Sequence, residues 1–235
     1  LGNSFVQHST AVSGGGIYIE VGAEIIVSGT KFCQNDPDHI DGDFVDDGDN
    51  SFFAACTLIW EIMGVDDFDG DGNDDILWRN VTSGANWLWL MSGLDILAGS
   101  DAVESVDDTN WKMQGIGDFN NDGRADIFWR NVVTGDNAMW FMDGTVLIGA
   151  ALVQSVTDTN WQVTGCGDFD GDGRVDLLWR NASEGRNIVW LMYGIAVVGG
   201  NELGSVPSTW EVQAVGDFSG DGRADIFWRD TVYGG

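Results

Sequence analysis

The sequence has few basic residues: 10 lysines and arginines stand against 38 aspartates and glutamates in 235 residues, a formal net charge of −28. A surface with this charge repels nucleic acid and anionic membranes, which argues against both as partners. The chain also lacks an apolar run as long as a membrane-spanning helix, so we expect no membrane insertion. With 43% apolar residues it is able to bury a core.

Histidine and cysteine are scarce as well. The two histidines, His8 and His39, lie near the start of the chain, and no nucleophile elbow or phosphate-binding loop is present, so we expect no enzyme. Three cysteines are an odd number. Cys33 and Cys56 form a disulfide or remain thiols, because connectivity cannot be read from sequence. Cys166 is predicted to be a small buried residue with a free thiol.

What the chain does contain is one acidic loop in four copies. The loop reads DFDGDGNDD at 67–75, DFNNDGRAD at 118–126, DFDGDGRVD at 168–176 and DFSGDGRAD at 217–225, with spacings of 51, 50 and 49 residues. Each copy has oxygen-bearing side chains at its first, third, fifth and ninth positions. Calcium binds six to eight oxygen ligands in a flexible shell, so the pattern predicts about four Ca²⁺ sites.

The predicted ligands are these side chains, the backbone carbonyl at the seventh position, and water. The first and third loops supply four carboxylates each and the other two supply three, which predicts an order of affinities. The loop that contains serine is predicted to bind most weakly, at ~10⁻⁴ M. In chain order the residues are Asp67, Asp69, Asp71, Asn73 and Asp75; Asp118, Asn120, Asp122, Arg124 and Asp126; Asp168, Asp170, Asp172, Arg174 and Asp176; and Asp217, Ser219, Asp221, Arg223 and Asp225.

An acidic loop could also belong to an EF-hand or to a surface turn without metal. An EF-hand has a glutamate at its twelfth position and a helix on either side, whereas here the twelfth residue is a tryptophan inside a strand-like run, which excludes it. An acidic surface turn without metal is the second, and four copies of one spacing argue against it. Seven aspartates between Asp36 and Asp49 lack that spacing and are predicted to lie in solvated turns.

Tryptophan follows the same period as the loops. Eleven of the twelve tryptophans recur at equivalent positions, with Trp87 the exception, and they are predicted to pack in a core between units. Each unit divides into four short apolar runs, such as WKMQGIG, DIFWRN, NAMWFM and TVLIGAALVQSV, separated by turn residues. Four antiparallel strands in about fifty residues predict a β-propeller-type blade, and no segment has a helical period.

An arginine directly follows one tryptophan in every unit. In so acidic a chain these residues are predicted to pair with nearby aspartates or to stack on an aromatic ring, in preference to binding an anionic ligand. They are Arg79, Arg130, Arg180 and Arg229.

Residues 1–56 differ from the repeats in their sequence pattern, which has short β-prone runs between small residues. Phe5 and Phe32 lie 27 residues apart in similar settings, a separation that suits one rung of a parallel β-helix. The stretch resembles the C-terminal end of a right-handed parallel β-helix. We therefore expect two domains: β-helix-like rungs at 1–56, and three full blades and half of a fourth at 57–235. Because the chain lacks an initial methionine and stops partway through a repeat, we expect it to belong to a longer protein.

The strings GDFDGDG and DILWRN resemble the FG-GAP or VCBS-type repeats of calcium-binding β-propellers, the blade type also seen in the integrin α-subunit head. The resemblance covers residues 57–235. It implies an all-β propeller, calcium that clamps the loops on one face, and a secreted or cell-surface protein. Such propellers commonly have seven blades. Either blades are missing here, another chain supplies them, or the units do not close into a ring.

Two functions from different classes follow from this. The first is a noncatalytic adhesion or recognition module that binds a glycan or a protein at the cell surface. The alternative is a structural subunit of an extracellular fibre or surface layer, whose partners are copies of itself. A polysaccharide-active β-helix enzyme is less favoured, because two rungs without a basic cluster do not sustain that activity and metal ligation accounts for the recurrent carboxylate pairs.

Overall fold

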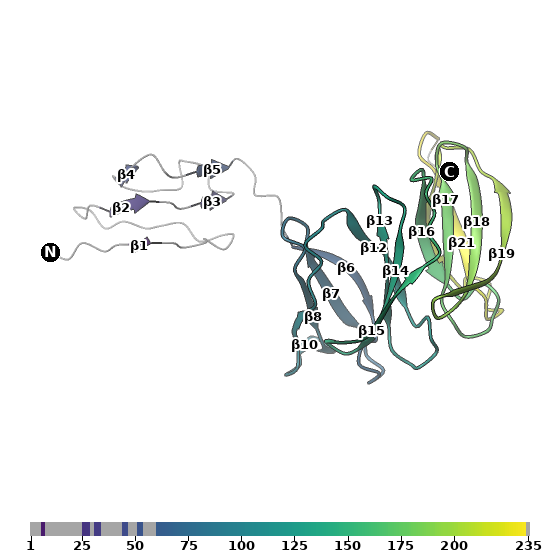
Figure 1. Cartoon of the computed structure of the whole chain (residues 1–235), viewed down its shortest axis with the longest axis horizontal. Coiled ribbons are helices and arrows are strands. Elements are labelled where there is room, and N and C mark those ends of the chain that lie inside the picture. Colours follow the sequence, from purple (N-terminus) through teal and green to yellow (C-terminus); the bar gives the residue numbers. More distant parts are fainter. Residues whose placement is uncertain are drawn as a thin grey trace. The chain divides into compact units, whose positions relative to one another are not determined.

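The computed structural model describes residues 60–233 fully and, before them, only the backbone of five short strands. The chain divides into two compact units, residues 1–59 and residues 60–235, and each is described by itself. Throughout the described residues the regular structure is β-strand, without any helix (Figure 1). The all-β class expected from the sequence is confirmed for this part of the chain.

Residues 60–233 form one antiparallel sheet for each repeat, and the sheets follow one another from blue to yellow in Figure 1. The first three sheets have four strands and the last has two. The strands are β6 (Trp60–Asp66), β7 (Asp75–Asn80), β8 (Asn86–Trp89) and β11 (Asp101–Val103), with a hairpin of β9 (Met91–Ser92) and β10 (Asp95–Ile96); β12 (Trp111–Gly117), β13 (Asp126–Asn131), β14 (Asn137–Asp143) and β15 (Val146–Val153); β16 (Trp161–Gly167), β17 (Asp176–Asn181), β18 (Arg186–Tyr193) and β19 (Ala196–Ser205); β20 (Trp210–Gly216) and β21 (Asp225–Asp230).

The second strand of each full sheet lies deepest. Every residue of β13 and of β17 is buried, as expected of a strand that is covered on both faces. By contrast, β15 alternates between exposed and half-buried residues over most of its length, which is typical of a strand with one face in water. The tryptophan-arginine strings of the sequence therefore form the best-covered strand of each sheet.

The cores lie between neighbouring sheets. One core joins Phe68 and Leu77 of the first repeat to Ile127 and Trp129 of the second. The next core joins the second repeat to Trp179 and other residues of the third. Because each core is shared, a single repeat has no complete core of its own, and stacking of neighbours supplies the stability. The predicted core role holds for six of the eleven recurring tryptophans, which are Trp111, Trp129, Trp140, Trp161, Trp179 and Trp190. The other five are not part of these two cores.

The first strands of neighbouring sheets approach each other closely at recurring glycines. Each of these strands has an irregularity in its register just before that position. A Cβ added to Gly64 would overlap the side chain of Ile116, and a Cβ added to Gly165 would overlap that of Val215. The glycines are therefore required by the spacing of the sheets.

An arginine on the second strand of one sheet stacks on a tryptophan of the next sheet. The Cζ atom lies 4.9 Å from the ring centroid in all three cases, which are Arg79 over Trp129, Arg130 over Trp179, and Arg180 over Trp228. The predicted stacking on an aromatic ring is confirmed for these three of the four arginines. None of these three arginines forms an ion pair with a carboxylate of the described residues.

Arg130 shows how most of the buried guanidinium is satisfied, although its Nε has no hydrogen-bond partner among the described residues. Its Nη1 donates to the carbonyl of Gly135 at 3.2 Å and to Oδ1 of Asn137 at 3.1 Å, and its Nη2 donates to the carbonyl of Val156 at 2.9 Å. The side chain is fully buried, and burial lowers the pKa of the guanidinium. Neutral oxygens and one aromatic face thus replace water around a permanent charge.

The first unit contains short strands in parallel pairs, and only their backbones are described. Val6 pairs with Val27, Ile25 with Phe44, and Phe32 with Phe52, so the described pairings join residues about twenty positions apart. They do not show the 27-residue rung. A parallel β-helix is not established by these fragments. The strands are β1 (Val6–Gln7), β2 (Ile25–Ser28), β3 (Lys31–Cys33), β4 (Phe44–Asp46) and β5 (Ser51–Phe53).

Several sequence predictions fall on residues that are not described. The partner of Cys33 in the suggested disulfide, Cys56, lies outside the described residues, as do His8, His39 and Phe5. In the described repeats, Cys166 is a free thiol whose Sγ donates to the carbonyl of Ile116 at 3.2 Å. The described sheets show no closed ring, so the propeller stays a prediction.

Replacing Arg130 by lysine is expected to destabilise the protein. Lysine keeps the positive charge but has no planar fork to make the same hydrogen bonds or to stack on Trp179. We expect the free energy of unfolding to fall by about 2–4 kcal/mol, as measured by urea denaturation. Arg229→Lys is the matched control, because Arg229 holds the same repeat position but is exposed. Equal losses in the two variants would contradict the role of the stack.

Candidate metal centres

The first aspartate of each acidic loop organises the loop backbone. Oδ1 of Asp67 accepts the N–H of Gly70 at 2.7 Å and that of Asp71 at 3.2 Å, and its Oδ2 accepts the N–H of Gly72 at 2.8 Å. The two glycines have φ of 80° and 86°, values that favour glycine. The same three bonds recur at Asp118, Asp168 and Asp217.

In the first three loops the ninth-position aspartate ties the loop to the third strand of its own repeat, or in the first repeat to β9, the short strand after it. Oδ2 of Asp126 accepts the N–H of Phe119 at 3.2 Å, and Oδ1 accepts that of Met142 at 3.2 Å. Asp75 and Asp176 make the equivalent two bonds. In the last repeat Asp225 instead accepts the N–H of Ser219 at 2.8 Å. Sequence reasoning assigned these residues to metal alone and missed this backbone role.

Burial raises the pKa of the three ninth-position carboxyl groups that lie in full sheets. The pKa reaches about 7 at Asp126 and about 6 at Asp176, and it is also raised at Asp75. Desolvation is the main cause, and the neighbouring aspartates of the same loop add repulsion. These sites therefore favour a positive charge nearby, either a proton or a cation.

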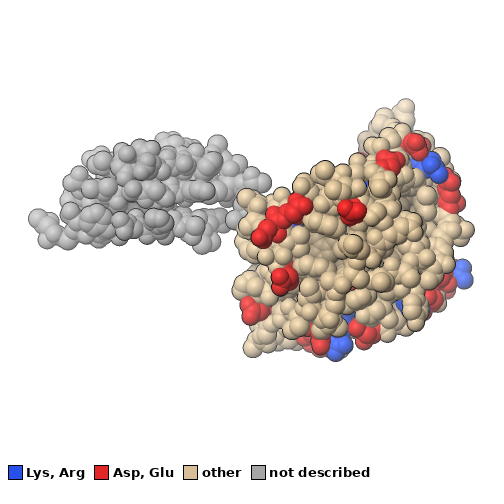
Figure 2. Space-filling view, in the orientation of Figure 1, with Lys and Arg blue, Asp and Glu red and all other residues tan. Residues whose placement is uncertain are grey.

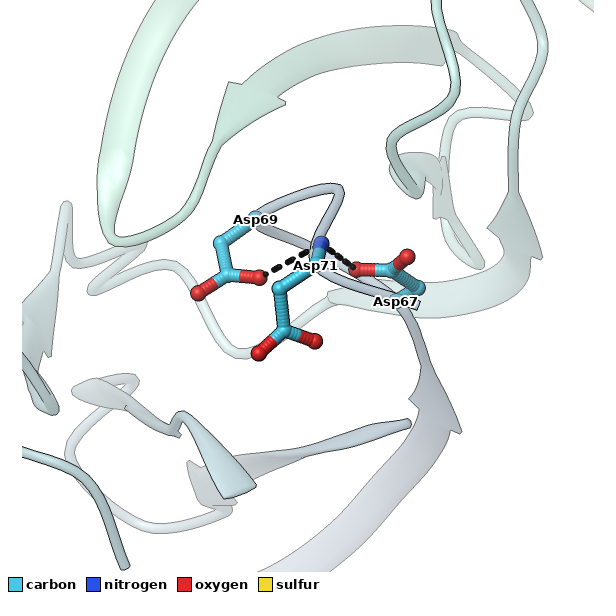
Figure 3. Close-up of side chains that lie close together, drawn as sticks. All are labelled: Asp67, Asp69 and Asp71. Carbon is cyan, nitrogen blue, oxygen red and sulfur yellow. Dashed lines mark hydrogen bonds between the residues drawn. The ribbon is translucent and has the colours of Figure 1, made fainter. Parts of the chain in front are cut away.

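Two loops bring three carboxylates together. Oxygens of Asp67, Asp69 and Asp71 lie within 4.8 Å of one another, and so do oxygens of Asp168, Asp170 and Asp176. Figure 3 shows the first group, where the backbone N–H of Asp71 donates to the carboxylates of Asp67 and Asp69. Asp75 is not part of the first group.

The remaining predicted ligands are arranged differently. Asp172 is not in the third-loop group, because its Oδ2 lies 2.8 Å from Nη1 of Arg174 in an ion pair. The second and fourth loops do not gather three carboxylates, since Asn120 and Ser219 take one position each. At the seventh position the backbone N–H donates to the fifth-position aspartate in every loop; the carbonyl ligands predicted there stay predictions. The donors are Asn73, Arg124, Arg174 and Arg223.

The donor set fits a hard divalent cation. Clustered carboxylate oxygens are the ligands that calcium prefers, and none of the groups contains a sulfur or an imidazole. In the second loop, Oδ1 of Asn120 is buried without a hydrogen-bond partner, at a predicted ligand position. A buried acceptor of this kind is expected to have a partner, and a bound cation would supply one. These residues would hold calcium through their side-chain oxygens.

The first three loops are also bonded to the next repeat. The carbonyl of Asp67 accepts the N–H of Ala125 at 2.7 Å, and the carbonyl of Phe68 accepts that of Gly144 at 2.8 Å. The equivalent bonds follow in the next pair of repeats, from Val175 to Asp118 and from Gly194 to Phe119. Loop geometry and sheet stacking are therefore coupled. The recurring glycine in the hairpin after the third strand was the sequence signal for this contact.

A family model for the FG-GAP-like repeat matches residues 67–129, 118–179 and 168–228. Each match begins at the first aspartate of a loop and ends at the tryptophan that follows the next loop, and together they cover more than half of the chain. The chain belongs to the FG-GAP-like repeat family. FG-GAP-like repeats often bind calcium, in agreement with the acidic groups found here. The matched span of an FG-GAP-like repeat thus includes the contact between neighbouring sheets.

Among solved structures, the chain is similar to "Crystal structure of the V. cholerae biofilm matrix protein Bap1", with 17% sequence identity and a TM-score of 0.33. The match covers 74% of this chain and 28% of that one. A TM-score this low supports no argument about fold or function. The chain matches none of the curated proteins.

Calcium affinity is expected to differ between loops. Asp168→Ala should weaken the tightest class of sites by about tenfold or more, because it removes a carboxylate from a group of three. Asp217→Ala, at the same position of the loop that contains Ser219, should change the overall affinity least. Isothermal titration of the two variants tests this order, and a larger loss for Asp217→Ala would reverse it.

The raised pKa of Asp126 predicts a pH effect in metal-free protein. A carboxyl whose folded pKa is about 7 holds its proton longer in the folded state than in the unfolded state, where the value is near 3.8. Stability in chelator should therefore fall as the pH rises from about 4 to about 7. Carbon-detected NMR titration should place Asp126 near 7, with Asp217 below its ordinary range because of backbone N–H bonds. Saturating calcium should shift the Asp126 transition to lower pH.

Proposed function

We propose that the chain is a noncatalytic calcium-binding module of a secreted or cell-surface protein, in which calcium stabilises the contact between repeats. The observation that carries this proposal is the convergence of three carboxylates in loops whose main chain is bonded to the next sheet. Without a cation, the clustered charges repel one another and oppose the loop geometry. Bound calcium supplies the compensating positive charge.

Aspartates and backbone carbonyls of the loop connect the proposed calcium site to the contact between repeats. The first aspartate holds the loop closed through three backbone N–H groups, and the ninth aspartate fixes the loop to the following hairpin. The carbonyls at the first and second positions then meet the next repeat. A loop that lost its shape would release these bonds, so cation binding and stacking of the sheets strengthen each other.

We also propose that the sheets are arranged radially, as the blades of a propeller. What supports this is the position of the first strands, which face one another across a groove of about 450 Å³. The groove is lined by residues 63–65, 113–116 and 163–166, one segment from each full sheet. The close approach at Gly64 and Gly165 is consistent with an inner side where strands crowd together.

Adhesion or recognition is the role that this scaffold suits. No helix among the described residues is long and apolar enough to cross a membrane. Acidic side chains are spread over the described face in Figure 2 and outnumber basic ones, as suits a solvated surface where calcium is abundant. Exposed apolar residues between strands, such as Leu94 and Val133, offer contact points for a glycan or a protein.

Calcium removal tests the central proposal. We expect each occupied site to add about 2.7 kcal/mol of stability at a calcium concentration one hundred times its Kd, since the metal binds only the folded loop. Thermal unfolding should therefore shift to lower temperature in chelator, and magnesium should restore it poorly. The matched control is Glu104→Gln, an exposed acid outside the loops. A melting temperature that chelator leaves unchanged would refute the proposal.

Ligand recognition requires its own experiment. The calcium-loaded chain should bind a subset of an immobilised glycan and cell-surface protein panel, and chelator should abolish the signal as the repeats loosen. If every binding signal persisted in chelator, ligand recognition would not depend on the calcium-bound fold. Absence of any signal in calcium would count against the adhesion role while leaving the metal proposal to the melting experiment.

A further inference from the structure

Neighbouring acidic loops are joined by a line of backbone hydrogen bonds. In the first loop, the N–H of Phe68 donates to Oδ2 of Asp75 at 3.0 Å. The carbonyl of Asp67 accepts the N–H of Ala125, in the second loop, at 2.7 Å. This carbonyl and the N–H of Phe68 belong to one peptide unit, which is planar and rigid. The unit therefore connects a carboxylate of the first loop to the backbone of the second.

The peptide unit that donates this bond from the second loop also contains a predicted calcium ligand. The N–H of Ala125 and the carbonyl of Arg124 are its two polar groups, and they point in opposite directions because the peptide is trans. Since the N–H is bonded to the first loop, that bond also sets the orientation of the Arg124 carbonyl. The seventh-position carbonyl predicted for one site thus depends on the loop before it.

The same line recurs in the next two pairs of loops. In each pair the ninth-position carboxylate accepts the N–H of the second residue, and the first-position carbonyl accepts the N–H of the eighth residue of the next loop. The bonds are Phe119 N–H to Asp126 at 3.2 Å and Val175 N–H to Asp118 at 3.1 Å, then Phe169 N–H to Asp176 at 2.9 Å and Ala224 N–H to Asp168 at 2.6 Å. Because the eighth residue is either alanine or valine, the main chain makes the link.

Burial restricts these peptide units to one arrangement. Phe68 and Phe119 are fully buried, and their carbonyls accept the N–H groups of Gly144 and Gly194 at 2.8 and 2.9 Å. A buried backbone group that loses its partner has no water to replace it. A change of backbone orientation in one loop would therefore break bonds in the next.

We propose that adjacent loops bind calcium with positive coupling, because each loop holds the eighth-position N–H of the next. The inference rests on the proposed calcium function and adds the dependence of one site on its neighbour. When a cation compensates the carboxylates of the first loop, Asp75 and the peptide unit of Asp67 become fixed. The Arg124 carbonyl is then already oriented for the second site, which loses less conformational freedom on binding.

This coupling has two general properties. It is reciprocal, so a cation in the second loop favours binding in the first to the same extent. Because each line of bonds joins only two loops, the effect should also decrease with every intervening loop. Both properties distinguish it from a repulsion between bound cations, which would weaken neighbouring sites.

The sixth-position glycines report on each site separately. Their N–H groups donate to the first-position aspartates, and they are Gly72, Gly123, Gly173 and Gly222. Calcium titration of the whole chain with isotope-labelled glycine follows these four amides by NMR. Asp69→Ala removes a carboxylate of the first group and leaves the line of bonds intact. We expect the calcium midpoint at Gly123 to rise by about fivefold or more, that at Gly173 to rise less, and that at Gly222 to change least.

Two control variants separate the backbone link from other effects. Glu104→Gln removes the same charge outside the loops and should leave the midpoint at Gly123 unchanged. Arg124→Ala removes a side chain that lies against the first loop, since a Cβ added to Gly70 would lie 3.5 Å from Cγ of Arg124. It keeps the peptide unit, so Asp69→Ala should still raise the Gly123 midpoint in this background.

Removal of one N–H group tests the link itself. Replacement of Ala125 by L-lactic acid turns the amide into an ester and deletes only the donor. In this background Asp69→Ala should no longer change the midpoint at Gly123, as a double-variant cycle measures. If this ester does not fold, the same replacement at Ala224 tests the link between the third and fourth loops, with Asp170→Ala and Gly222 as the pair. Melting curves show which variants are folded.

Several results would overturn the inference. The midpoint at Gly123 could be unchanged or lower in Asp69→Ala, or all the sites could shift equally. Loss of the coupling in Arg124→Ala would assign it to the side chain, and its survival in the folded ester would separate it from the N–H bond. If no glycine amide of the wild type responded to calcium, the proposed metal function itself would fail. Four independent midpoints would leave that function standing and remove only the coupling.

Discussion

The stacking of a buried arginine on the tryptophan of the next repeat is the interaction on which the rest of this fold depends. Arg79, Arg130 and Arg180 carry their charge into the interior without a carboxylate partner, and backbone carbonyls and an indole face take the place of water. The oxygens belong partly to the arginine's own repeat and partly to the start of the next one. Removal of one repeat would leave the guanidinium of its neighbour unsatisfied, so the repeats are stable only as a stack.

The acidic loops are coupled to the same contact. Their aspartates organise the loop, and the loop carbonyls then accept N–H groups from the next sheet. Burial raises the pKa of Asp126 and so opposes its ionisation, and the neighbouring aspartates of the same loop add repulsion. The two places differ in their charge: the sheet contact holds a buried arginine whose charge burial disfavours, whereas the loop holds carboxylates whose charge a calcium ion would compensate reversibly.

Much of this was predictable from particular residues. The tryptophan period indicated shared cores, and the acids at positions one, three, five and nine indicated oxygen-rich loops. The hydrogen bonds that Asp75, Asp126 and Asp176 accept from methionine backbone N–H groups were not predictable, because each methionine lies 16 residues away in the sequence. The parallel pairing of Phe32 with Phe52 was missed for a related reason: similar sequence settings at Phe5 and Phe32 say nothing about which strands become neighbours.

The sequence by itself determined the β-class, the repeat length and the oxygen-bearing side chains of the loops, because each depends on local spacing and on side-chain chemistry. Only the tertiary structure decided which arginine meets which tryptophan and which carboxylates converge. Asp172 has the spacing of a ligand but pairs with Arg174, and Trp78 has the period of a core residue but lies half-open. Contacts between repeats depend on how the sheets pack. The sequence pattern shows how often an equivalent residue recurs, but it does not show which residue of the next sheet that residue contacts.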